Sequence, residues 1–228
     1  MITFAGKLIL LDIEGTVSPL AFVHDIMFPY ARQRAGAYIA THWGTAVIAQ
    51  LAHDAGVPAF DSPAEAEAAV YRLMDADAKV TGLKQLQGMI WEQGFHNGEL
   101  RSTLFDDVPQ ALEDWCQQGR EIRIYSSGSI HAQKLFFAHT ECGDLTRHFS
   151  GYYDTTTGSK RESTSYTAIA VDCGLPAEQI LFVSDLMEEL NAARNAGMMT
   201  ALAIRPGNKP QAESGHPAIH SFDELVLA

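Results

Sequence analysis

The chain has 228 residues, of which 46% are hydrophobic, and a formal net charge of −12 at pH 7. The hydrophobic fraction excludes a disordered protein, and the length fits one large domain or a core with a smaller inserted unit. An acidic surface argues against nucleic acids and anionic membranes as partners, because both attract Lys and Arg. The first residues lack the pattern of a signal peptide, and no apolar run approaches the ~20 residues that span a bilayer. We therefore expect a cytoplasmic protein.

The three cysteines, Cys116, Cys142 and Cys173, are widely spaced and include no C-x-x-C pair. They indicate neither a disulfide framework nor a zinc site. If the ligand is an anion, an acidic chain must supply positive charge locally. A divalent cation with one or two basic side chains is the simplest source.

The first strong pattern is the aliphatic run Leu8-Ile9-Leu10-Leu11, which ends in Asp12 and Glu14 and then Gly15-Thr16. Four consecutive aliphatic residues predict a strand that is buried on both faces, as in a parallel sheet. The two acids then follow the carboxyl end of this strand, which is where open α/β sheets bind their ligands.

A long helical region follows a turn at residues 17–20. The apolar spacing predicts helices over residues 22–28, 37–52, 63–79 and 83–93, with the first ending near Phe28-Pro29. Ser62, Pro63 and Glu65 form a strong helix start, since the Ser can cap and the Glu stands three residues after it. No strand pattern interrupts this region, and its size suits an inserted subdomain.

Strands and helices alternate from about residue 107 onward. We expect strands over 121–125, 180–183 and 199–204, helices over 109–118, 130–138, 164–173 and 188–195, and a polar loop over 151–159. This alternation predicts a parallel sheet with helices on both faces. The predicted fold is a doubly wound, Rossmann-like α/β core of residues 1–17 and 107–228, with an all-helical domain of residues 18–106 inserted after the first strand.

Polar residues follow three of the predicted strands: Asp12 with Glu14, Ser126 with Ser127, and Asp185. Because parallel strands end at the same edge of a sheet, these residues meet in one crevice if their strands are neighbours. Two nearby carboxylates require a cation or a proton between them, and three oxygen ligands suit Mg²⁺.

Each of these residues also has a simpler interpretation. Asp12 alone suits a turn, Ser127 or Ser129 can cap the following helix, and Lys160 can be solvated surface. On the functional side, serines and free N–H groups at a helix start bind anions. Lys160 is the nearest candidate for neutralising a phosphate. Asp185 follows a buried strand directly, which favours a functional role over mere charge at a helix start.

These residues, taken together, carry a family resemblance. Asp12-Ile13-Glu14-Gly15-Thr16 resembles the first motif, Asp-x-(Asp/Glu)-Gly-Thr, of the haloacid dehalogenase superfamily of phosphohydrolases. Ser126 or Ser127 resembles its second motif, Lys160 its third and Asp185 its fourth. The helical insert resembles the mobile cap of that superfamily. The second acid of the first motif is present in phosphoryl-transferring members and absent from those that remove halide.

Several longer segments resemble one family within this superfamily. They are residues 10–16 with Glu in place of the usual second Asp, residues 28–31, the insert segment 83–91, residues 125–129 and residues 133–135. Together they resemble the acireductone synthase family, the enolase-phosphatases of methionine salvage.

The resemblance implies a role for each motif residue. Asp12 is the nucleophile that forms an aspartyl-phosphate, and Glu14 protonates the leaving oxygen and then activates water. Mg²⁺ is held by Asp12, Asp185 and the backbone carbonyl of Glu14. The phosphoryl oxygens are held by three residues: Ser126, Ser127 and Lys160.

The implied reaction has two stages. The substrate 2,3-diketo-5-methylthiopentyl-1-phosphate is enolised, and the enol phosphate is hydrolysed to 1,2-dihydroxy-3-keto-5-methylthiopentene and phosphate. The base of the first stage stays open between Glu14 and Lys160. Phe22, Phe28 and Trp91 are candidates to line a pocket for the methylthio tail, although ordinary core packing is the simpler interpretation.

Two other functions are compatible with these motifs. One is a phosphatase of the same superfamily that acts on another small metabolite, such as a sugar phosphate. The other is a binding module for phosphorylated metabolites without catalysis, which would not need the complete set of acids. In each case we expect a small phosphorylated ligand, no nucleic-acid or membrane partner, and a monomer.

Overall fold

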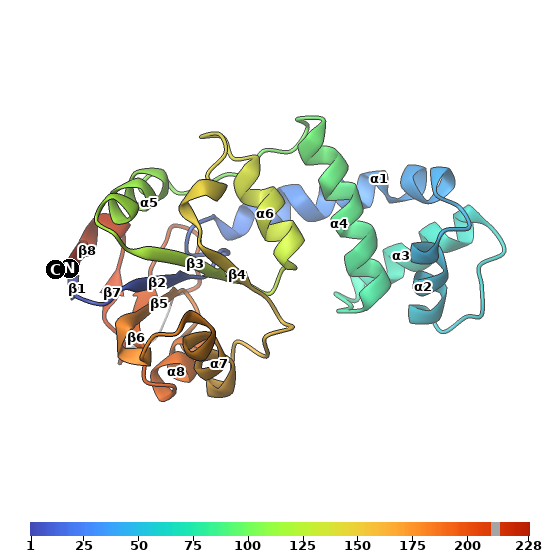
Figure 1. Ribbon diagram of the computed structural model, residues 1–228. Coiled ribbons are helices and arrows are strands. Elements are labelled where there is room, and N and C mark those ends of the chain that lie inside the picture. The colour runs from blue at the N-terminus through green and yellow to red at the C-terminus, as the bar shows by residue number, and fades with distance from the viewer. Residues whose placement is uncertain (211–214) are drawn as a thin grey trace. The chain divides into compact units, whose positions relative to one another are not determined.

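The computed structural model describes residues 1–210 and 215–228 (Figure 1). Two compact units are distinguished by their internal contacts. One comprises Met1–Phe22 and Arg101–Ala228, and the other comprises Val23–Leu100. The strands of the described residues all belong to the first unit, which we call the α/β unit, and the second is helical. The predicted insert, residues 18–106, extends a few residues beyond the helical unit at each end.

The α/β unit is built on a six-stranded parallel sheet in the order β4-β3-β2-β5-β6-β7. Its strands are β2 (Leu8–Leu11), β3 (Glu121–Tyr125), β4 (Gly151–Tyr153), β5 (Ile180–Ser184), β6 (Met199–Ala203) and β7 (Ala218–Ile219). Every residue of β2 and β5 is buried, as expected for strands covered on both faces. The predicted parallel α/β core is confirmed.

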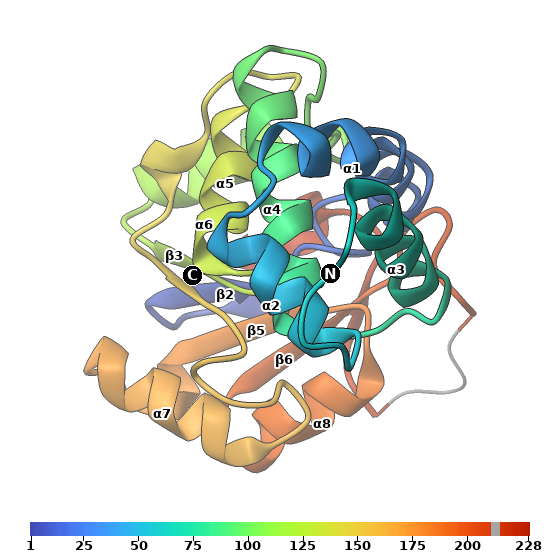
Figure 2. The same ribbon diagram turned by 90° about the vertical axis from the view of Figure 1, so that its right-hand side faces the viewer.

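Helices cover both faces of this sheet. They are α5 (Val108–Gln117), α6 (Ile130–Ala138), α7 (Ser163–Cys173) and α8 (Met187–Asn195), with short 3₁₀ turns at Thr146–His148, Ala177–Gln179 and Phe222–Glu224. Helices α5 and α6 lie on one face and α7 and α8 on the other (Figure 1). Figure 2 shows α7 and α8 side by side below the strands, where Tyr166 and Leu190 pack with Phe182.

Short strands are the elements that the sequence pattern missed. Strand β4 lies inside the segment 151–159, which was wrongly predicted to be loop throughout. Strands β1 (Ile2–Phe4) and β8 (Leu225–Leu227) form a separate two-stranded sheet that brings the two chain ends together (Figure 1). Strands of two or three residues are too short to show an alternating pattern, and pairing with neighbours determines them instead.

The helical unit contains η1 (Phe22–Met27, a π-helical turn that starts at the end of the α/β unit), α1 (Phe28–Thr41), α2 (Ala46–Asp54), α3 (Pro63–Asp75) and α4 (Thr81–His96). The cap predicted at Ser62 is confirmed, since its side chain accepts a hydrogen bond from Glu65 N at 3.2 Å. The predicted helix over 37–52 is wrong, because α1 ends at Thr41 and Gly44 turns the chain with a positive φ of 80°.

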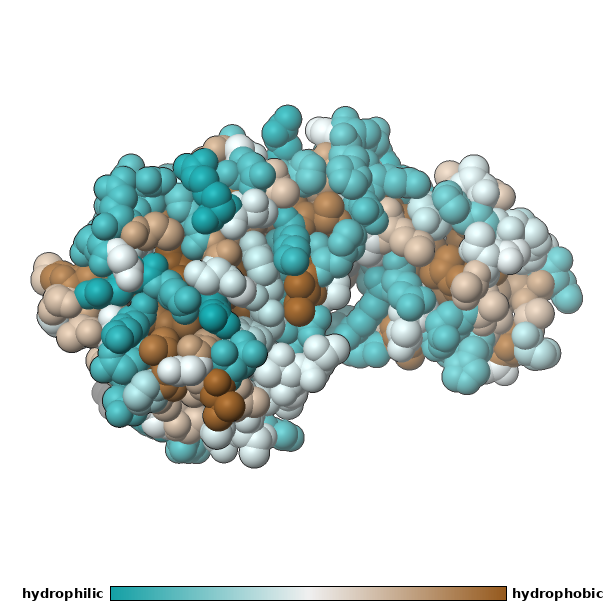
Figure 3. All heavy atoms as spheres, viewed as in Figure 1, coloured by the Kyte–Doolittle hydropathy of each residue, from teal (hydrophilic) through white to brown (hydrophobic). Residues whose placement is uncertain are grey.

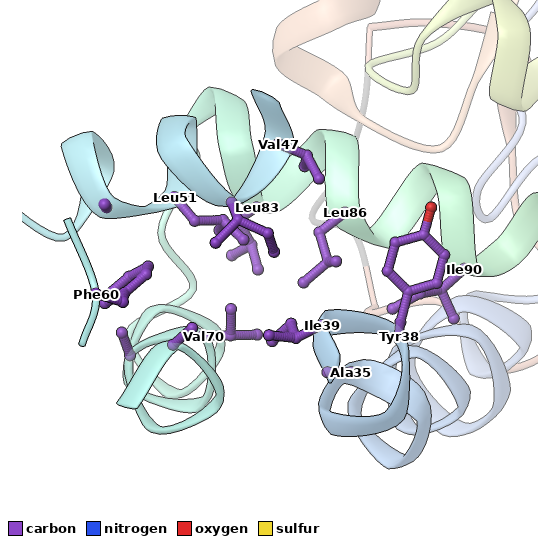
Figure 4. Close-up of a cluster of buried hydrophobic side chains, with 14 of the residues drawn as sticks. Ala35, Tyr38, Ile39, Val47, Leu51, Phe60, Val70, Leu83, Leu86 and Ile90 are labelled. Atoms are coloured by element: carbon purple, nitrogen blue, oxygen red, sulfur yellow. The ribbon is translucent and has the colours of Figure 1, made fainter. Parts of the chain in front are cut away.

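The predicted helix over 22–28 corresponds to η1, which ends at Met27, but it is not followed by a break, because α1 begins directly at Phe28. Pro29 therefore stands in the first turn of α1. A proline is tolerated there because the first N–H groups of a helix have no intrahelical partner. The helical unit has a hydrophobic core of its own, shown in Figure 4, in which Ile39, Leu51, Leu83 and Leu86 are almost completely buried.

The surface in the view of Figure 3 is largely hydrophilic, with a few hydrophobic areas among the polar residues. No helix in the described part of the chain is long and apolar enough to span a bilayer.

Candidate active site

The sheet order brings the polar ends of three strands together. Strand β2 lies between β3 and β5, with Leu11 level with Ile124 on one side and with Val183 on the other. The residues that follow these strands therefore lie at one edge of the sheet. This is also the switch point of the topology, since the chain runs from β2 outward in both directions, and open α/β sheets bind ligands there.

Lys160 lies at the centre of this edge and is almost completely buried. Its Nζ is 2.6 Å from Asp12 Oδ1 and 2.6 Å from Glu189 Oε2. Ser184 Oγ, at the end of β5, is 3.0 Å from Glu189 Oε2 and 3.3 Å from Asp12 Oδ2. Its hydroxyl can therefore donate a hydrogen bond to one or the other of these acids. One cation thus joins two carboxylates that come from β2 and α8.

The backbone near Lys160 is fixed by side chains of the core. Tyr125 Oη donates to Gly158 O at 3.0 Å, and Tyr166 Oη donates to Lys160 O at 2.8 Å. Both tyrosines are fully buried. A polar loop thereby holds its lysine in one place, which a solvated surface lysine would not need.

Burial and neighbouring charges together shift the pKa values of these groups. Burial alone would lower the pKa of Lys160, but the charges of Asp12 and Glu189 outweigh it and raise the pKa, so the ammonium stays protonated. The pKa of Glu189 is raised, first by burial and then by the charge of Asp12. Burial and the charge of Asp12 also raise the pKa of Asp185 to about 7. Three carboxyl groups therefore interact with one ammonium at this edge.

The loop after β2 turns sharply over Asp12 to Ser18. Gly15 has a φ of 71°, a value that side chains rarely adopt, and its N–H donates to Ser18 O at 2.8 Å. A Cβ on Gly15 would lie 2.5 Å from Asp185 Oδ2, so the carboxylate of Asp185 packs directly over this glycine. Glu14 is partly exposed and raises the pKa of Asp185 through its charge.

The two predicted serines differ in their surroundings. Ser126 is buried, and its Oγ accepts a weak hydrogen bond from Gly128 N at 3.4 Å. Ser127 is exposed. The cap of α6 is Ser129, whose Oγ accepts from Ala132 N, so neither Ser126 nor Ser127 is occupied as the helix cap.

The three aromatic candidates for a tail pocket differ in burial and in the unit to which they belong. Phe22 is buried in the α/β unit, where its ring meets that of Phe136 at 5.8 Å, and it serves as core. Phe28 and Trp91 are half-buried in the helical unit, with ring centroids 6.0 Å apart. Trp91 Nε1 donates to Met27 O at 2.8 Å, which fixes the orientation of its ring.

Comparison with known proteins agrees with this geometry. The family model of haloacid dehalogenase-like hydrolases matches residues 7–197. The chain is 47% identical to enolase-phosphatase E1 of Pseudomonas aeruginosa (strain LESB58) over 97% of its own length and 98% of the relative's, and 45% identical to that of Synechococcus elongatus over 95% and 96%. The chain belongs to the enolase-phosphatase E1 family of the haloacid dehalogenase-like hydrolases.

A solved structure supports the assignment to this family. The UTR4 protein of Saccharomyces cerevisiae is 34% identical, with a TM-score of 0.83 over 96% of this chain and all of the other.

Two residues of this site were not predicted from the sequence. Glu189 stands in the first turn of α8, where acids suit the helix dipole, yet its side chain is buried against Lys160. A usable signal was its position directly before the buried Leu190 in a helix that begins close to Asp185. Ser184 gave no signal, since it reads as the end of a strand.

The residues available for a metal ion are few. Within residues 1–210 and 215–228 no cluster of three or more His, Cys, Asp or Glu side chains is arranged to hold one. The donor set at the sheet edge consists of two interacting carboxylates, Asp12 and Asp185, beside a tight turn with backbone carbonyls. Such a set does not suit Zn²⁺, which prefers His and Cys, but it fits Mg²⁺, which binds few carboxylates and keeps waters.

Proposed function

We propose that this protein is the enolase-phosphatase that converts 2,3-diketo-5-methylthiopentyl-1-phosphate to 1,2-dihydroxy-3-keto-5-methylthiopentene and phosphate in methionine salvage. Family membership gives the reaction class, and near full-length relatives carry the name enolase-phosphatase E1. The observation that carries the proposal is the buried Lys160, held at 2.6 Å from Asp12 where three strands end. A phosphohydrolase needs a nucleophile and a phosphate-binding cation in just this proximity.

We assign the nucleophile to Asp12. Its Oδ1 accepts from Ile13 N at 2.7 Å and lies 2.6 Å from Lys160 Nζ, which fixes the carboxylate beside a positive charge. Attack on phosphorus forms an aspartyl-phosphate, which splits one hard hydrolysis into two easier steps. Ser126, Ser127 and Lys160 would bind the phosphoryl oxygens, and Lys160 offsets the negative charge that develops on them.

Glu14 is the proposed acid and base. It is partly exposed and two residues from Asp12, so it can give a proton to the leaving oxygen and later take one from water. The structure also narrows the choice of base for enolisation. A protonated ammonium paired with Asp12 and Glu189 cannot accept a proton, which disfavours Lys160 and favours Glu14.

Mg²⁺ is the proposed cofactor. Asp12, Asp185 and the backbone carbonyl of Glu14 would hold it. When bound, the ion offsets negative charge on the phosphate and polarises the carbonyl next to the carbon that loses a proton. The excess of carboxylates at this edge supports the presence of a cation during catalysis.

We further propose that the helical unit has the role of the superfamily's cap and that its half-buried Phe28 and Trp91 contribute to recognition of the methylthio tail. Aromatic rings with part of their surface exposed suit an apolar thioether. The protein is proposed to act as a cytoplasmic monomer, which sedimentation of the purified chain would test.

The central experiment incubates purified protein with Mg²⁺ and the diketone phosphate and follows enol absorbance and phosphate release together. Wild type should give both signals, and Asp12→Asn should release no phosphate. A panel of sugar phosphates run in parallel tests the alternative of a phosphatase for another metabolite. Fast turnover of a sugar phosphate with none of the diketone would refute the salvage assignment, and no release from any ester would favour a binding module.

A further inference from the structure

The turn after β6 reaches the same edge of the sheet as the proposed active site. It consists of residues 205–208, and Asn208 N donates to Arg205 O at 3.1 Å across it. Because β6 pairs with β5, with Leu202 level with Ser184, this turn lies just beyond the strand that carries Asp185. No residue of the turn is used in the mechanism proposed above.

Two side chains of this turn hold the loop that follows β2. Asn208 Nδ2 donates to Gly15 O at 2.9 Å, and Arg205 Nε donates to Thr16 O at 3.0 Å. Two successive carbonyls of the loop are thus bound by the first and last residues of the turn. The peptide planes after Glu14 are fixed as a result, and with them the direction of the neighbouring backbone carbonyl.

Arg205 is explained by structure alone. Its guanidinium also donates to Asp107 at 2.8 Å and to His220 O at 3.1 Å, and it lies over the rings of Phe105 and Phe222. These contacts bury Arg205 in the α/β unit, where it is 5% exposed, and only its Nη2 has no hydrogen-bond partner among the described residues. We therefore assign it to holding the loop.

In the side-chain amide of Asn208, the nitrogen has hydrogen-bond partners but the oxygen has none among the described residues. Its Nδ2 donates both to Gly15 O and, at 3.3 Å, to Ala203 O, and this use of both hydrogens fixes which way the amide points. Its Oδ1 is buried, yet it accepts no hydrogen bond from any residue in the described ranges. An orphaned buried acceptor is unusual and requires an explanation.

Asn208 Oδ1 lies near Gly15 and the carboxylate of Asp185. A Cβ built on Gly15 would lie 3.1 Å from Asn208 Oδ1 and 2.5 Å from Asp185 Oδ2. Both oxygens therefore border the same small region beside Gly15, and both accept hydrogen bonds. The oxygen that lacks a partner is Asn208 Oδ1, and a hydrated divalent cation bound beside Asp185 would supply it with a donor through one of its waters.

We propose that Asn208 is a positioning residue for the metal side of the active site: its amide nitrogen fixes the Gly15 turn, and its Oδ1 accepts a hydrogen bond from the hydration shell of the divalent cation beside Asp185. This inference rests on the Mg²⁺ dependence proposed above. It assigns Asn208 no contact with the reacting atoms.

The test measures Mg²⁺ binding without substrate, by isothermal titration calorimetry and by the rise of Tm with Mg²⁺ concentration. The variants are Asn208→Ala, which removes both functions, and Asn208→Ser, which keeps one donor for a loop carbonyl but lacks the amide oxygen. Asn195→Ala, at an exposed asparagine at the end of α8, is the matched control. Each Asn208 variant should weaken Mg²⁺ binding about tenfold, as loss of an outer-shell partner does. The control should match wild type.

The readouts separate this inference from the function on which it rests. If wild type binds no Mg²⁺, both the cofactor proposal and the role of Asn208 are overturned. If wild type binds Mg²⁺ and both Asn208 variants bind it equally well, only the role of Asn208 is overturned, whatever happens to Tm in EDTA. If Asn208→Ala fails to fold, Asn208→Ser alone decides, because it keeps a donor for the loop.

Discussion

Asp185 is expected to destabilise the metal-free protein, and replacing it by Asn should therefore stabilise the fold while it abolishes turnover. Burial, followed by the nearby charge of Asp12, raises the pKa of its carboxyl from 3.8 to about 7. A raised pKa in the folded state means that the folded protein holds a proton more tightly than the unfolded chain does. Stability is then lost as the pH rises from about 4 to 7.

The size of the effect follows from the two pKa values. At roughly 1.4 kcal/mol per tenfold change in the equilibrium constant, the ionised carboxylate costs on the order of 4 kcal/mol at pH 8 and about 2 kcal/mol at pH 5. Asn has the same shape and no charge. For a chain of this size, 4 kcal/mol corresponds to an increase in Tm of about 8 °C or more.

The assay is scanning calorimetry in EDTA at two pH values. Asp185→Asn should raise Tm at pH 8 and should raise it by less than half as much at pH 5. Saturating Mg²⁺ should raise the Tm of wild type but leave that of the variant unchanged. The control variant Asp106→Asn, at an exposed position, should have the same Tm as wild type at both pH values. A lower Tm for Asp185→Asn at pH 8 in EDTA would refute the reasoning, because it would show that the carboxylate is net stabilising without a cation.

Three further substitutions test other parts of the structure. Lys160→Met should lower kcat roughly 10²–10³-fold and lower Tm, because it leaves Asp12 and Glu189 buried without their cation, whereas Lys84→Met at an exposed site should do neither. Gly15→Ala should lower kcat and weaken Mg²⁺ binding, since its Cβ would displace Asp185 and its φ disfavours a side chain; unchanged Mg²⁺ binding would contradict this geometry. Leu86→Ala should destabilise the helical unit by about 2–5 kcal/mol in urea unfolding, and a loss below about 1 kcal/mol would argue against the packed core of Figure 4.

The sequence predicted the candidate site best where an acidic residue follows a buried aliphatic run. The aliphatic run before Asp12 and the run before Asp185 each predict a buried strand, and parallel strands end at one edge by geometry alone. The observed order, with β2 between β3 and β5, is what brings those ends side by side. That order could not be read from periodicity, because a strand pattern carries no information about its neighbours.

The rest depended on contacts between distant segments. The break at Gly44 interrupts an otherwise continuous helical pattern, and a single glycine does not identify such a break by itself. Glu189 and Asn208 are polar residues at ordinary helix and turn positions, where solvent is the usual partner. Their contacts could not be predicted, because Glu189 pairs with Lys160 and Asn208 binds Gly15, and both partners come from distant parts of the chain.

The carboxyl groups around Lys160 lead us to expect an order in which the metal ion and the phosphate ester bind. Asp12, Glu189 and Asp185 surround a single ammonium, that of Lys160, in a chain that already carries a net charge of −12. A phosphate ester brings further negative charge, which such a site repels. The Lys160 ammonium is already shared by two carboxylates, so it cannot offset the phosphate by itself. We therefore expect the proposed Mg²⁺ to enter before or together with the substrate, because it would offset the charge of these acids before the phosphate approaches them.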